Sequence, residues 1–135
     1  MSKIIGIDLA GHESVNPLSS PRKLEEMRIV FEEAGPGLGR TVHVGETTHV
    51  DVETFIKTVE VLKPTRVGHP IAAIRALWDK KDDRGIKILK ERGIVCELCV
   101  KSNLLTGAVK DLPEYGRILS TLDNYGIEYT FSTDA

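Results

Sequence analysis

The chain has 135 residues, which is enough for one domain with one modest hydrophobic core. Its formal net charge of −2 gives no electrostatic basis for binding nucleic acid, which requires a basic face. Its apolar runs are far shorter than the roughly 18 residues of a transmembrane span, and the apolar stretch after Met1 is too short for a signal peptide. We therefore expect a cytoplasmic protein that binds neither nucleic acid nor membranes.

Five short apolar segments rich in β-branched residues predict five strands. They cover residues 3–9, 40–44, 65–68, 94–100 and 129–132. Between them, apolar residues at helical spacing predict four helices. These cover residues 21–34, 51–62, 71–92 and 113–124, with an interruption near Arg84 and Gly85 left open. Pro21 favours a first helical turn, Asp51 can cap the second helix, and Gly93 is placed to end the third.

Regular alternation of strand and helix predicts a parallel sheet, which is either curled as part of a barrel or open and doubly wound. An open nucleotide-binding sheet carries a glycine-rich phosphate loop after its first strand. Here Gly6-x-x-x-x-Gly11 is followed by His-Glu instead of Lys-Ser/Thr, and no Gly-x-Gly-x-x-Gly motif opens a helix. We therefore predict an α/β fold, a partial TIM (β/α) barrel of about five parallel strands, with the open sheet as the alternative.

Five strands of a barrel that closes with eight leave two open sheet edges. We expect the uncovered barrel interior to be lined by Ile5, Ile7, Val42 and Val67. Because open strand edges pair with other chains, we predict a homo-oligomer or an assembly with a complementing chain.

The two cysteines form a Cys96-x-x-Cys99 motif within an apolar segment. Such a motif is compatible with a redox pair or with half of a zinc site. On a strand, however, residues three apart point to opposite faces, so both sulfurs cannot reach one metal ion. A redox pair also needs a helix N-terminus that lowers a thiol pKa. We therefore expect both to be core cysteines.

Ionisable side chains recur where the predicted strands end. His43 and Glu46 lie three positions apart at the end of the second strand, His69 ends the third strand, and Asp134 follows the fifth. The carboxyl ends of parallel strands are where barrels assemble their active sites. Histidine and aspartate are zinc ligands, and zinc lowers the pKa of bound water to about 7. A nearby histidine can orient or deprotonate that water and a glutamic acid can donate a proton, so the pattern predicts a metal-assisted hydrolase.

Five motifs occur along the chain in this order: Ile7-Asp8-Leu9-Ala10-Gly11, Thr41-Val42-His43-Val44-Gly45-Glu46, Arg66-Val67-Gly68-His69, Ser102-Asn103-Leu104-Leu105-Thr106-Gly107 and Thr133-Asp134. Together they resemble the adenosine deaminase family over nearly the whole chain. The resemblance implies that residues 1–135 are a single unit, the C-terminal part of that family's barrel, with its fourth to eighth strands. It also implies a zinc-dependent aminohydrolase that acts on the 6-amino group of an amino-purine nucleoside or a related compound.

The resemblance implies a role for five residues. His43 would be a zinc ligand, and Asp134 would be a second ligand that also orients the attacking water. Glu46 would protonate the purine ring nitrogen N1, and His69 would position or deprotonate the attacking hydroxide. Gly11 would donate its backbone N–H to the ring nitrogen N3.

The chain also departs from the family pattern. The family's first strand carries a His-x-His pair that supplies two further zinc ligands, and no two histidines here are two positions apart. We therefore expect an incomplete zinc site and an inactive isolated chain. Ala135 stands where the family has a second aspartate that contacts the purine, which keeps a different amino-purine or a non-purine substrate as an alternative. A non-catalytic half-barrel that serves only in assembly is the other alternative.

Overall fold

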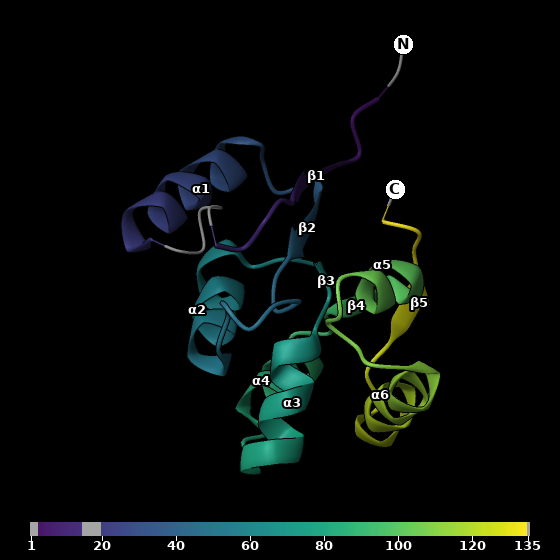
Figure 1. Ribbon diagram of the computed structural model, residues 1–135. Coiled ribbons are helices and arrows are strands. Elements are labelled where there is room, and N and C mark those ends of the chain that lie inside the picture. Colours follow the sequence, from purple (N-terminus) through teal and green to yellow (C-terminus); the bar gives the residue numbers. More distant parts are fainter. Residues whose placement is uncertain (1–2, 15–19, 135) are drawn as a thin grey trace.

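The computed structural model describes residues 3–14 and 20–134, which form one five-stranded sheet with helices packed along it (Figure 1). The strands are β1 (Gly6–Leu9), β2 (Gly39–His43), β3 (Arg66–Gly68), β4 (Val95–Leu98) and β5 (Tyr129–Phe131). Every neighbouring pair is parallel, and the order is β1-β2-β3-β4-β5. All five predicted strands are therefore present, with ends that differ from the prediction by a few residues.

Six helices occur in the described part of the chain: α1 (Pro21–Glu33), α2 (Val52–Leu62), α3 (Ile71–Lys80), α4 (Arg84–Glu91), α5 (Val100–Leu105) and α6 (Leu112–Tyr125). Asp51 caps α2 by accepting a hydrogen bond from the Thr54 N–H at 2.8 Å, which confirms the predicted cap. Asp111 caps α6 in the same way through the Glu114 N–H, and Gly126 ends that helix with a φ of 63°. Among the described residues, none of the helices has the length and hydrophobicity needed to cross a bilayer.

The predicted helix 71–92 is two helices, because the chain turns at residues 81–83. Lys81 ends α3 in a left-handed conformation with a φ of 59°, and α4 begins after Asp83. Gly85 lies buried inside α4, where a Cβ would come within 2.8 Å of the Cβ of Ala73 in α3. The interruption therefore precedes Arg84 and Gly85, and the glycine allows close packing of two helices instead of forming a turn.

The sequential strand order decides between the two predicted architectures. In an open doubly wound sheet the strand order reverses part-way, and helices cover both faces. Here each strand pairs with the next one along the chain, and α1, α2, α3 and α6 follow one another around one side of the sheet (Figure 1). This is the arrangement of a (β/α) barrel, so the open-sheet alternative is wrong.

The hydrophobic core lies between the sheet and the surrounding helices. Val42, Val67 and Cys96, on neighbouring strands, are fully buried and belong to one cluster with apolar residues of the helices. Arg66 and Glu97 alternate with them on the opposite face, where they form an ion pair and stay partly exposed. Since successive strand residues point to opposite faces, the prediction that Val42 and Val67 line the barrel interior is wrong: they face the helices.

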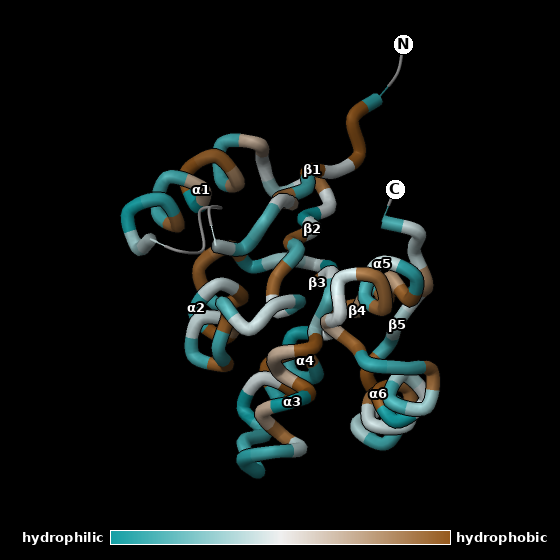
Figure 2. Tube along the Cα trace, viewed as in Figure 1, coloured by the Kyte–Doolittle hydropathy of each residue, from teal (hydrophilic) through white to brown (hydrophobic). Residues whose placement is uncertain are grey.

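The two outer strands are less well covered than the inner ones. Ile4 and Ile5, just ahead of β1, are 72% and 80% exposed, and Phe131 in β5 is 60% exposed. In Figure 2 the apolar stretch beside the N label runs away from the rest of the chain. Ile7, within β1, is only partly buried against the core. Exposed apolar side chains at the two edges of a sheet favour pairing with another polypeptide.

Both cysteines are free and buried. Cys96 lies in β4, whereas Cys99 lies one residue beyond that strand, directly before α5. Burial raises the pKa of the Cys96 thiol to about 12 and that of the Cys99 thiol to about 11. Both therefore remain neutral thiols near pH 7, and the prediction of core cysteines is confirmed.

Candidate active site

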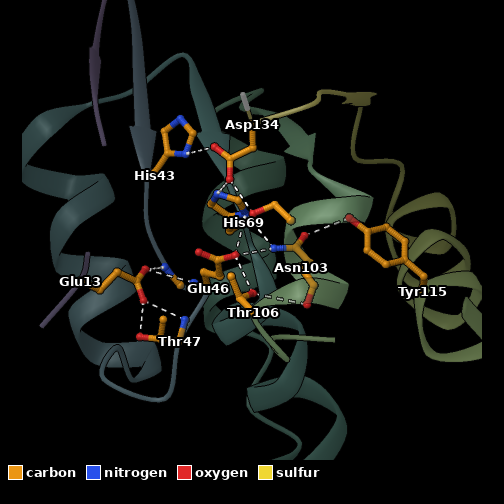
Figure 3. Close-up of polar contacts among 11 residues, drawn as sticks. Glu13, His43, Glu46, Thr47, His69, Asn103, Thr106, Tyr115 and Asp134 are labelled. Atoms are coloured by element: carbon orange, nitrogen blue, oxygen red, sulfur yellow. Dashed lines mark hydrogen bonds and ion pairs between the residues drawn. The ribbon is translucent and has the colours of Figure 1, made fainter. Parts of the chain in front are cut away.

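Three side chains predicted at strand ends meet in space (Figure 3). His43 is the last residue of β2, His69 follows β3, and Asp134 follows β5. The Asp134 carboxylate lies 3.8 Å from His43 Nδ1 and 3.5 Å from His69 Nε2, and the two imidazole centres are 5.1 Å apart. His69 is buried, while the side chains of His43 and Asp134 are partly exposed.

Two of these residues have backbone conformations that L-amino acids rarely adopt. His69 has a φ of 61° and Asp134 a φ of 56°, and such left-handed residues cluster at functional sites. Gly68 gives the His43 ring its space, because a Cβ at this position would lie 2.9 Å from His43 Nδ1. The local backbone at these strand ends therefore directs the side chains toward one point.

A further carboxylate adjoins His43 from the neighbouring strand. Asp8 in β1 has Oδ2 at 3.3 Å from His43 Nε2, so the ring stands between Asp8 and Asp134. The sequence placed Asp8 in a motif but indicated no role for it. Asp8 pairs with Thr41, which lies two positions before His43 on β2. The side chains of Asp8 and His43 therefore point to the same face of the sheet.

Asn103 links Glu46 to His69 (Figure 3). Its side-chain Nδ2 donates to Glu46 Oε1 at 2.9 Å and lies 2.8 Å from His69 Nδ1. Its amide oxygen accepts a hydrogen bond from the Tyr115 hydroxyl at 3.1 Å. Burial raises the pKa of Tyr115, so this hydroxyl keeps its proton. Thr106 Oγ1 donates to the same Glu46 oxygen at 3.1 Å. We call His43, Glu46, His69, Asn103 and Asp134 the rim cluster.

These hydrogen bonds fix the tautomer of a neutral His69. A side-chain NH₂ group can only donate, so His69 Nδ1 is the acceptor and the ring proton lies on Nε2, which faces Asp134. They also orient the carboxyl group of Glu46. Both donors reach Oε1, so a proton on this group would lie on Oε2.

Helix α5 supplies several of these polar groups, and it is absent from the predicted elements. Ser102 donates to Asp134 Oδ2 at 2.7 Å, while Asn103 and Thr106 bond to Glu46. Val100 opens this helix although it was predicted to end a strand, since an apolar run gives the same signal for a long strand and for a strand followed by a helical turn. Thr106 directly follows α5 as its C-terminal cap, three positions after Asn103, and this spacing places both side chains on one side of the helix.

One cleft of about 320 Å³ is lined by every residue for which the sequence predicts a role: Gly11, His43, Glu46, His69 and Asp134. His12, which the sequence leaves without a role, also lines the cleft, and its ring lies 5.9 Å from that of His49, another histidine without a predicted role. The structure thus brings together residues from the ends of β1, β2, β3 and β5.

Glu13 is a buried carboxylate at this cleft that the sequence does not single out. It is 5% exposed, and its oxygens accept hydrogen bonds from the N–H groups of Gly45, Glu46 and Thr47 and from the Thr47 hydroxyl. A glutamate in a loop is most often solvated, so the sequence carries no local signal for this role. The contacts join the loop after β1 to the loop after β2.

The rim cluster offers ligand atoms that suit a metal ion. Atoms of His43, His69 and Asp134 lie within 4.8 Å of one another. Tetrahedral zinc binds imidazole nitrogen and carboxylate oxygen at about 2.0–2.2 Å, which separates the ligand atoms by roughly 3.3–3.6 Å. The Asp134 carboxylate has separations of 3.5 and 3.8 Å from the two imidazoles. The three side chains therefore lie close enough together to hold a metal ion between them.

Comparison with known proteins identifies the family. The family model described as adenosine deaminase matches residues 2–135. The chain belongs to the adenosine deaminase family. It is 32% identical to an aminodeoxyfutalosine deaminase from Acidothermus cellulolyticus over 97% of this chain and 35% of that protein. It is 38% identical to an adenosine deaminase from Clostridium kluyveri over 83% of this chain and 28% of that protein.

A solved structure of adenine deaminase from Arthrobacter aurescens resembles the chain with a TM-score of 0.70 at 23% identity, covering 96% of this chain and 35% of that one. At this level of identity the likeness establishes the fold, a partial TIM barrel. The chain spans about a third of the length of the curated relatives it matches. The adenosine deaminase family is metal-dependent, in keeping with the ligand atoms of the rim cluster.

Proposed function

We propose that this chain carries the catalytic strand ends of a zinc-dependent deaminase that hydrolyses the amino group of an amino-purine nucleoside or a related compound. The proposal rests on the observation that Glu46 lines the same cleft as His43, His69 and Asp134. Hydrolytic loss of ammonia from a purine needs an acid close to a metal-ligand pair. The adenosine named for one relative supports an amino-purine as the substrate class.

His43 and Asp134 would hold the zinc ion, and the remaining ligands would come from outside this chain. When bound, zinc lowers the pKa of a water molecule to about 7 and makes hydroxide available at neutral pH. Ser102 bonds to Asp134 Oδ2 at 2.7 Å, while Oδ1 faces His43. The hydroxyl of Ser102 would therefore hold Oδ2 of Asp134 in place, while Oδ1 stays free to bind or to orient a water molecule.

Glu46 would donate a proton to the ring nitrogen N1. Hydroxide adds to the purine carbon that bears the amino group more readily when the adjacent nitrogen is protonated, so an acid must face that nitrogen. Asn103 and Thr106 both bond to Oε1 of Glu46. The proton of a neutral Glu46 would therefore lie on Oε2, the oxygen that these donors leave for the substrate.

His69 would position the attacking oxygen instead of deprotonating it. Its Nδ1 accepts from Asn103, which leaves the Nε2–H as a donor on the Asp134 side. Gly11 would donate its backbone N–H to the ring nitrogen N3. The assignment is supported by its place on the cleft and by a φ of 129°, which favours glycine at this position.

We further propose that another polypeptide completes the barrel. Strands β1 and β5 lie at the two edges of the sheet, near the exposed Ile5 and Phe131. A complementing chain or a second copy would cover these edges, and a complementing chain would also supply the missing zinc ligands.

The test is turnover by a completed barrel, in which this chain is fused to the part of the Acidothermus cellulolyticus relative that lies outside the aligned residues. We expect the completed barrel to release ammonia from at least one amino-purine, to lose activity on dialysis against a chelator, and to regain it with zinc. His43→Ala should remove both zinc and activity, and the 135-residue chain alone should have negligible turnover.

Two outcomes of this test would favour the alternatives. Zinc binding with hydrolysis of non-purine amines or amides only would indicate an amidohydrolase with another substrate. A completed barrel that neither binds zinc nor releases ammonia would contradict the proposal and favour a non-catalytic assembly piece.

A further inference from the structure

The carboxylate of Glu13 is committed to a single loop. Its Oε1 accepts from the N–H groups of Gly45 and Glu46, and its Oε2 accepts from the N–H of Thr47 at 2.8 Å and from the Thr47 hydroxyl at 2.6 Å. Each oxygen thus takes two of the four hydrogen bonds. Both oxygens of the Glu13 side chain are therefore fully engaged by N–H and O–H donors, and hydrogen bonds to a carboxylate are stronger than those between neutral groups.

The same loop is tied to the barrel from its other side. Gly45 has a φ of 93°, and its carbonyl oxygen accepts from the N–H of Ala72 in the first turn of α3 at 2.8 Å. A Cβ at Gly45 would lie 3.1 Å from both Ala72 and Phe55. Helices α2 and α3 thus contact the loop at Gly45, and Glu13 binds it at the cleft.

The loop that Glu13 holds carries the proposed proton donor. Glu46 is the middle residue of the three whose N–H groups bond to Glu13, and its own carboxyl group reaches across the cleft to Asn103 at 2.9 Å. The side-chain position of Glu46 depends on this backbone, and an error of about 1 Å in the placement of a reacting group can cost about 10²-fold in rate.

We propose that Glu13 is a positioning residue, whose buried carboxylate sets the backbone of residues 45–47 and thereby places the Glu46 carboxyl group against Asn103. The catalytic consequence rests on the proposed function. The structural consequence does not, because it concerns hydrogen bonds within this chain. The experiment has one arm for each.

The first arm uses NMR on the 135-residue chain and compares Glu13→Gln with Glu33→Gln, a matched change at an exposed glutamate of α1. In Glu13→Gln the glutamine NH₂ group would face the N–H and the hydroxyl of Thr47, and it cannot accept hydrogen bonds from them. Glu13→Gln should therefore lower the exchange protection of the Glu46 and Thr47 amides by about tenfold or more, and should shift the Asn103 side-chain NH₂ resonances. Glu33→Gln should change neither. Unchanged Asn103 resonances in folded Glu13→Gln would overturn the proposal.

Thr47→Val provides a milder change if Glu13→Gln does not fold. It removes one donor to Glu13, keeps the other three and preserves the side-chain shape. The amide protection of Glu46 should fall in the same direction by a smaller factor, with a smaller shift at Asn103. If neither the amide protection of Glu46 nor the Asn103 resonances change in Thr47→Val, the proposal is overturned, whatever the result for Glu13→Gln.

The second arm measures kcat and KM in the completed barrel. Glu13→Gln should lower kcat by about 10² with little change in KM, because the proton is needed only in the transition state. Wild-type kcat in a variant that has lost the amide protection would overturn the positioning role. If the wild-type completed barrel has no activity, the proposed function fails, and the first arm alone decides whether Glu13 places Glu46.

Discussion

The rim cluster and the core on the helix side of the sheet are built from the same short strands, but their residues have different roles. Val42 and Val67 are fully buried against the helices. Their immediate neighbours are His43, which belongs to the rim cluster, and Gly68, which gives the His43 ring its space. One step along the strand therefore separates a residue that stabilises the fold from one that shapes the site.

The two regions also differ in backbone conformation. His69 and Asp134 adopt left-handed conformations that cost free energy, whereas the core strands are regular. Strain of this kind persists only where the surrounding structure holds it in place. The core should therefore determine whether the chain folds, and the partly exposed members of the rim cluster, His43 and Asp134, should tolerate substitution with little loss of stability but a large loss of function.

The largest effect on stability is expected from the core. Phe55 in α2 is fully buried, and Phe55→Ala should lower the free energy of unfolding by about 3–5 kcal/mol through lost burial and a new cavity. Urea denaturation measures this. Ile29→Ala on α1, where the side chain is 44% exposed, is the control and should stay within about 0.5 kcal/mol. Similar losses for the two variants would contradict the position of the core.

Gly68→Ala tests the rim cluster. The added methyl group would lie 2.9 Å from His43 Nδ1 and should displace the ring. We expect the zinc affinity of the completed barrel to fall about 10–100-fold, the usual cost of disturbing the support of a metal ligand. Gly116→Ala in α6, where a Cβ meets no atom within 4 Å, is the matched control. Unaltered zinc affinity in Gly68→Ala would mean that Gly68 does not set the position of His43.

The buried thiol of Cys96 in the core should make the stability of the chain depend on pH. Burial raises the pKa of Cys96 from 9.0 to about 12. Below pH 9 both states keep the proton, and above it the unfolded state ionises first. This thiol should therefore lower the free energy of unfolding by up to about 1.4 kcal/mol per pH unit between pH 9 and 12. Urea denaturation at pH 8.5 and 10.5 should give a shallower decline for Cys96→Val, and identical declines would argue against a buried thiol.

The sequence predicts the strands, their parallel order and most of the rim cluster, because apolar runs and the residues that end them are local signals. Glu13 could not be predicted in this way: its partners Gly45, Glu46 and Thr47 are more than thirty positions away, and only the closed fold brings them together. The inner face of the sheet was assigned wrongly for Val42. Its neighbour His43 faces the cleft, and because successive strand residues point to opposite faces, Val42 faces the helices.

The role of Glu46 as the proton donor is tested by the rate and zinc content of the completed barrel with Glu46→Gln. Glutamine keeps the size and the contacts to Asn103 and Thr106 but cannot donate the proton to N1. We predict that zinc content remains at the wild-type level and that the rate of ammonia release falls by about 10²–10⁴, the usual contribution of a general acid. A wild-type rate on every amino-purine that the completed barrel accepts would show that Glu46 is not the proton donor.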